Sequence, residues 1–95
     1  MAYDPGALEA ALSAALGDDP ALILEMQTAF LDSATAHVAA LERAQLATEW
    51  TQAAWRLRGL AASFGAIELM HAADWAGEAP PRDGAALAAV RAAVA

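Results

Sequence analysis

The chain has 95 residues, a net charge of −7 and no cysteine. This length fits one domain, residues 1–95, with a single modest hydrophobic core. Twelve acidic residues against five arginines exclude general affinity for DNA or RNA, because that binding needs Lys or Arg to displace phosphate counterions. The lack of cysteine also excludes disulfides and thiolate metal sites.

Hydrophobic residues make up 59% of the chain, and about thirty residues are alanines. Alanine has the highest helix propensity, so the composition predicts an almost wholly helical protein. No stretch reaches the ~18–20 uninterrupted apolar residues that span a bilayer, and the first residues lack the pattern of a signal peptide. We therefore expect a cytoplasmic domain with no membrane contact, and the alanine bias suggests a bacterial genome rich in GC.

Two helices are predicted in the first half of the chain. Asp4 and Pro5 form a start signal for a short helix that ends near Leu16, and Gly17 is a natural C-terminal cap. Asp19 and Pro20 repeat the start signal, and a long helix is expected from Ala21 to about Ala47. The predicted inward residues of these helices are Leu8, Leu12, Leu16, Leu22 or Ile23, Met26, Phe30, Ala34, Val38, Leu41, and Ala44 or Gln45.

A third helix is predicted from a cap at Thr48 to about Ser63, and its two faces differ. Its apolar stripe consists of Trp50, Ala53, Ala54, Leu57, Leu60, Ala61 and Phe64. The opposite face carries Thr51, Gln52, Trp55, Arg56, Arg58, Gly59, Ala62 and Ser63. Trp55 is the exception on this polar or small face. We expect it either to fold onto a neighbouring helix or to be an exposed anchor stacked on Arg58 by a cation–π contact.

Gly65 predicts a turn or a tight contact between helices, followed by a fourth helix to about Ala76. The segment from Gly77 to Pro81 is predicted to be a turn, and Asp83 is expected to cap a last helix from Gly84 to about Val94. Predicted inward residues are Ala66, Leu69, Met70, Ala73, Leu87, Val90 and Val94. Short connections between amphipathic helices favour an all-α fold, an antiparallel up-and-down four-helix bundle with a short extra N-terminal helix.

The segment AAWRLRGLAASFGAIEL resembles the signature of histidine-containing phosphotransfer (HPt) domains, the helical bundles of phosphorelays and two-component systems. The matching positions are Ala54, Leu57, Gly59, Ala61, Phe64, Gly65, Ala66 and Leu69, with Phe30 and Trp50 upstream. Arg58 stands where the family usually has Lys. The resemblance covers nearly the whole chain and implies a bundle that binds a response-regulator receiver domain or a histidine kinase.

The position of the family's phosphoacceptor histidine is occupied by Trp55, whose indole has no lone-pair nitrogen to attack an acyl phosphate. The cation at Arg58 and the room at Gly59 remain. The resemblance therefore implies a pseudo-phosphotransfer domain that acts as a decoy, scaffold or modulator. The expected partner-binding residues are Trp55, Arg58, Gly59, Arg56, Gln52, Thr51 and Ala62. No catalytic residue, metal or cofactor is expected, and the protein is not predicted to be an enzyme.

Two other functions stay open. Phosphate could be transferred through His37 or His71, although neither has a cation and a glycine one turn away. The chain could also be a helical interaction or dimerisation module with no link to phosphorelays, and a monomer or a weak homodimer is expected. A metal site built from His37, His71 and Asp74 is a weaker alternative, because the spacing of these residues matches no metal motif.

Overall fold

A computed structural model describes residues 5–17 and 19–94, and within these ranges the chain forms five helices and no strand. The prediction of an all-α fold is confirmed. The helices are α1 (Pro5–Leu16), α2 (Pro20–Arg43), α3 (Ala47–Ser63), α4 (Ile67–Glu78) and α5 (Gly84–Val94). No helix in the described part of the chain is both long and apolar enough to cross a membrane.

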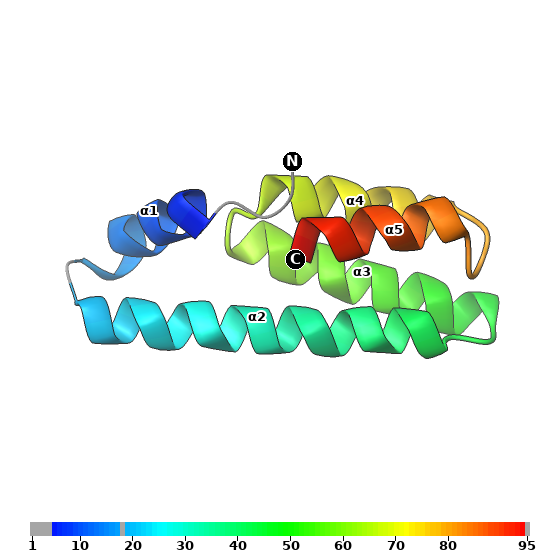
Figure 1. Cartoon of the computed structure of the whole chain (residues 1–95), viewed down its shortest axis with the longest axis horizontal. Coiled ribbons are helices and arrows are strands. Elements are labelled where there is room, and N and C mark those ends of the chain that lie inside the picture. Colours follow the sequence, from blue (N-terminus) through cyan, green and yellow to red (C-terminus); the bar gives the residue numbers. More distant parts are fainter. Residues whose placement is uncertain (1–4, 18, 95) are drawn as a thin grey trace.

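Four of the helices pack around a common core. In this group α2 contacts α3, α3 contacts α4, α4 contacts α5, and α5 returns to α2. Each of these helices runs in the direction opposite to the one before it (Figure 1). The N-terminal part of α2 extends past the other three helices, and α1 packs against α2 near this extension (Figure 1).

The predicted caps account for several helix ends. The Asp19 carboxylate accepts a hydrogen bond from the backbone N–H of Leu22 at 3.2 Å, which begins α2. The Asp83 carboxylate likewise accepts from the N–H of Ala86 at 2.9 Å at the start of α5. Gly17 ends α1 with a φ of +78°, a backbone conformation that favours glycine. The cap predicted at Asp4 lies outside the described residues.

Gly65 makes the turn between α3 and α4, as predicted. Its φ is +70°, and its N–H donates to the carbonyl of Ala62 at 3.3 Å. The next N–H, of Ala66, donates to the carbonyl of Ala61 at 2.9 Å. These two bonds define a Schellman motif, which satisfies carbonyls that would otherwise lack partners at the end of α3.

The connection between α2 and α3 differs from the prediction. α2 ends at Arg43 rather than near Ala47, and α3 begins at Ala47, so the predicted cap at Thr48 is wrong. The reason lies in Glu49, whose carboxylate accepts hydrogen bonds from the backbone N–H groups of Gln45 (3.1 Å) and Leu46 (3.0 Å). These bonds close the turn early and place Thr48 inside α3.

The predicted turn from Gly77 to Pro81 is also wrong at its first two residues. Gly77 and Glu78 belong to α4, which ends at Glu78. The turn itself is formed by Pro80 to Asp83, where the N–H of Asp83 donates to the Pro80 carbonyl at 3.1 Å. Gly77 costs the helix ~1 kcal/mol relative to Ala, and it lies against the ring of Trp55, as described below.

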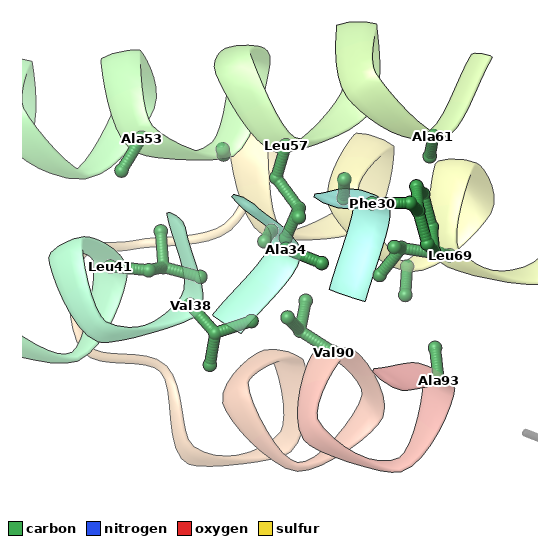
Figure 2. Packing of buried hydrophobic residues seen from close by; sticks show 14 of the residues in the cluster. Phe30, Ala34, Val38, Leu41, Ala53, Leu57, Ala61, Leu69, Val90 and Ala93 are labelled. Atoms are coloured by element: carbon green, nitrogen blue, oxygen red, sulfur yellow. The ribbon is translucent and has the colours of Figure 1, made fainter. Parts of the chain in front are cut away.

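The core follows the predicted stripe of α3. Trp50, Ala53, Ala54, Leu57 and Ala61 are buried, while Leu60 and Phe64 are partly buried. Figure 2 shows Leu57 pointing from α3 toward Ala34 and Val38 of α2, with Val90 of α5 approaching from the opposite side. Of the alternatives predicted for the long second helix, Ile23 and Ala44 are buried, whereas Leu22 is half-buried and Gln45 is exposed; Ala44 and Gln45 lie just after the end of α2. The remaining buried core residues include Leu8, Leu12, Phe30, Leu41, Leu69, Ala73, Ala76 and Ala93.

Two arginines fasten the C-terminal part of the chain to the end of α2. The Arg82 guanidinium donates to the backbone carbonyls of Glu42 (3.3 Å) and Ala44 (3.5 Å). Arg91 in α5 forms an ion pair with the side chain of Glu42, with an N–O distance of 2.6 Å. The exposed carbonyls at the end of α2 therefore obtain donors from a loop about 40 residues further along the chain.

Candidate functional site

All seven predicted binding residues lie on the side of α3 that faces away from the core. Trp55 is 46% exposed, and it stands midway along the helix. Around it, Gln52, Arg56, Gly59 and Ala62 are exposed, while Thr51 and Arg58 are half-buried. The helical spacing of the sequence is sufficient to place them there, because residues three and four apart share one face of a helix.

The Trp55 side chain both leans on a neighbouring helix and stays partly exposed beside Arg58, so each of the two expectations for it is met in part. Its ring leans toward α4, where a Cβ atom added to Gly77 would lie 3.4–3.5 Å from three atoms of the indole. The Arg58 guanidinium carbon lies 5.9 Å from the centre of the same ring, within the range of a cation–π contact. The indole is thus held on two sides, and nearly half of its surface remains open to a partner.

Arg58 is not a free cation. Its guanidinium forms a hydrogen-bonded ion pair with the carboxylate of Asp74 in α4. Trp55 and Arg58 are three positions apart in α3, and Asp74 and Gly77 are three positions apart in α4. Since α3 and α4 run in opposite directions, the two pairs face each other, with Trp55 against Gly77 and Arg58 against Asp74.

Gly59 differs from Gly77 in its surroundings. No described atom outside its own stretch of helix lies within 4 Å of a Cβ added to Gly59, so the space above this residue is open. Gly59 therefore does not make room for another helix within the described part of the chain. Only the expectation of room for an incoming partner remains.

A shallow hollow runs along the N-terminal half of this face. It has a volume of about 640 Å³ and a mostly apolar lining, which consists of Ala47, Thr48, Thr51, Gln52, Trp55 and Arg56. Trp55 forms one end of this hollow. Four of the seven predicted binding residues line it, whereas Arg58, Gly59 and Ala62 lie beyond it.

A second, smaller hollow of about 260 Å³ lies between α2 and α3. His37, Arg43, Glu49, Gln52 and Arg56 contribute polar side chains to its lining. Hydrogen bonds from the N–H groups of Leu46 and Gln45 hold the pKa of the Glu49 carboxyl below its ordinary value. Gln52 and Arg56 line both hollows, so the two are neighbours along α3.

The structure does not bring the two histidines together. His37 lies on α2 and His71 on α4, and the backbones of these two helices do not approach each other closely. Among the described residues, no three His, Asp or Glu side chains form a group that could hold a metal ion. Asp74, the third member of the metal alternative, is instead paired with Arg58.

The sequence analysis missed Asp74, Gly77 and Arg43 as members of this region. A signal was available for the first two, because residues 74 and 77 lie three apart on one face of α4, as 55 and 58 do on α3. No local pattern pointed to Arg43, since its neighbourhood depends on how α2 and α3 pack.

No family model, curated protein or solved structure matches this chain.

Proposed function

We propose that this chain is a pseudo-phosphotransfer domain, an HPt-like antiparallel four-helix bundle with an extra N-terminal helix that binds a receiver domain or a histidine kinase without carrying phosphate. The order of contacts from α2 through α5 and the alternating helix directions support the bundle. The exposed position of Trp55, midway along α3, corresponds to the place where the family presents its histidine.

The observation that carries this proposal is the pairing of a half-exposed indole with open space one turn away. Trp55 is 46% exposed, and nothing lies within 4 Å of an added Cβ at Gly59. Trp is among the residues most enriched in binding hot spots, and a clear approach lets a partner's surface reach it.

The chemistry at this position supports binding rather than transfer. The indole nitrogen lone pair belongs to the aromatic system, so it cannot attack a phosphoryl group. Arg58 is engaged by Asp74 and by the indole, which keeps its positive charge from serving as a free partner for phosphate. What the face offers is an apolar anchor, a hollow beside it and the exposed cation of Arg56.

The test is a binding titration against the receiver domains of the same organism, with Trp55→Ala as the variant. Trp75→Ala is a matched control, because Trp75 is 48% exposed and lies on α4. We expect Trp55→Ala to weaken binding at least tenfold, or ~1.4 kcal/mol, and Trp75→Ala to weaken it less than twofold. Equal binding by wild type and Trp55→Ala would refute the proposal.

Two further outcomes would assign a different function. Acid-labile phosphate taken up from a phosphorylated receiver, and lost in His37→Gln or His71→Gln, would establish transfer through another histidine. A mass that rises with concentration, without binding to any receiver, would indicate a dimerisation module. Trp55→His adds a positive test, since an imidazole on this face should accept phosphate if the receiver docks there as proposed.

A further inference from the structure

The arginines of this chain divide into two groups. Three have partners: Arg58 pairs with Asp74, Arg91 pairs with Glu42, and Arg82 donates to the last carbonyls of α2. The other two, Arg43 and Arg56, form no ion pair or hydrogen bond through their guanidinium groups within the described part of the chain. Twelve acidic residues are present, so the lack of a partner is notable on a chain with a net charge of −7.

Both unpaired arginines line the smaller hollow, although they come from different helices. Arg43 lies at the end of α2 and Arg56 in the middle of α3. The α2 macrodipole favours a cation at Arg43, but no helix end lies near Arg56 in its own helix. Two like charges at one hollow repel each other, and an anion between them would relieve that repulsion.

The other polar groups of the hollow are compatible with an anion. The imidazole of His37 and the amide of Gln52 can both donate hydrogen bonds. Glu49 is the one acidic residue in the lining, and its Oε1 atom already accepts from two backbone N–H groups at the start of α3. The Glu49 carboxylate contributes one negative charge to the hollow, but it forms no ion pair with Arg43 or Arg56, and two cations face this single carboxylate.

We propose that His37, Arg43 and Arg56 form a binding site for carboxylate side chains of the partner protein that docks on α3. This inference rests on the proposed function, and it moves the electrostatic contact from Arg58 to the α2–α3 hollow. The neighbouring hollow ends at Trp55 and shares Gln52 and Arg56 with this site. A partner with an apolar residue flanked by acidic ones would fill both hollows at once, the apolar residue against Trp55 and the carboxylates at the arginines.

The test uses the full chain with Arg43→Gln, Arg56→Gln and the double variant. Arg91→Gln is the matched control, because it changes the net charge equally on α5. We expect each single variant at the site to weaken receiver binding three- to tenfold, the double variant to weaken it more than tenfold, and Arg91→Gln less than twofold. The double variant should also show a shallower dependence of affinity on salt, since fewer charges meet at the interface.

The outcomes separate this inference from the proposed function. If Trp55→Ala weakens binding and the double variant does not, the carboxylate site is refuted while the docking face stands. If no receiver binds, the proposed function fails. The carboxylate site is then tested by titrating the full chain with a hexaglutamate peptide at constant ionic strength and recording ¹H–¹⁵N NMR chemical shifts. Shifts confined to Arg43, Arg56 and His37, and absent in the double variant, support it.

Inorganic phosphate is the second probe in the NMR titration. Shifts caused by phosphate alone would indicate a small-ion site and overturn the assignment to protein carboxylates. Equal shifts at Arg91 and at the two site arginines would show nonspecific attraction, which also overturns it. If neither probe causes chemical-shift changes, the carboxylate site is also refuted.

Discussion

Gly59 lies in the interior of α3, and the structure gives a definite expectation for its replacement by alanine. No described atom outside the local helix lies within 4 Å of the added Cβ, and the residue is exposed. The methyl group therefore neither clashes nor becomes buried. The change in stability should equal the difference in helix propensity, which favours Ala by ~0.8–1.0 kcal/mol.

For a domain of this size, 1 kcal/mol corresponds to a rise in Tm of about 4–8 °C. Thermal and urea unfolding followed by circular dichroism would measure it, with an unchanged m-value as the check that the unfolding transition is comparable. Gly77→Ala is the matched comparison. Gly77 is one residue from the end of α4, where helix propensity counts less than in the interior, so the propensity gain should be smaller.

The same Gly59→Ala variant should bind the receiver at least threefold more weakly, because the methyl group occupies the approach to Trp55. A stabilised protein with weakened binding is the expected pair of results. A loss of stability would show that Gly59 packs against another part of the chain, and the reasoning on open space would be wrong. Higher stability with unchanged binding would mean that the clearance has no role in docking.

Three further predictions concern the elements that hold this face in place. Trp50 is 1% exposed and its Nε1 donates to the Ala76 carbonyl at 2.6 Å, so Trp50→Phe should lower the free energy of unfolding by about 1–3 kcal/mol in urea titrations; an unchanged midpoint would contradict this. The lowered pKa of Glu49 means that its ionised form stabilises the fold fully above its ordinary pKa of 4.5, and that this contribution is lost as the pH falls through the folded value. The difference in the free energy of unfolding between wild type and Glu49→Gln should therefore shrink as the pH is lowered. A constant difference from pH 7 to pH 3 would contradict a stabilising role for the hydrogen bonds from Gln45 and Leu46. Arg82 has a φ of +65°, so Arg82→Gly should be more stable than Arg82→Ala by about 1 kcal/mol, although both lose the bonds to α2; equal melting temperatures would show that the backbone is unstrained.

The periodicity of the sequence predicted the helices well, because the spacing of apolar residues within one helix is enough to show which face is buried. The stripe through Leu57 is buried, the caps at Asp19 and Asp83 form as expected, and Gly65 makes its turn. Each of these depends on residues within one or two turns of each other. Local sequence spacing was therefore enough to predict these features.

Contacts between helices could not be predicted in the same way. Thr48 and Glu49 are both able to organise a helix start, and the outcome depends on which side chain reaches the free N–H groups. Gly77 was predicted to begin a turn, and its position against the Trp55 ring joins residues 22 positions apart in the sequence. The pairing of Arg58 with Asp74 likewise requires the register between α3 and α4, which neither segment specifies alone.

The double attachment at Glu42 bears on the order in which the chain folds. Its backbone carbonyl is bound by Arg82, and its carboxylate by Arg91, which is 49 residues further along. Helices α2, α3 and α4 can pair by local chain reversals, but α2 and α5 meet only through contacts of long sequence separation. The part of the core between α2 and α5 therefore closes last, and loss of α5 would leave helices α1–α4 with Val38 uncovered on the side that Val90 occupies.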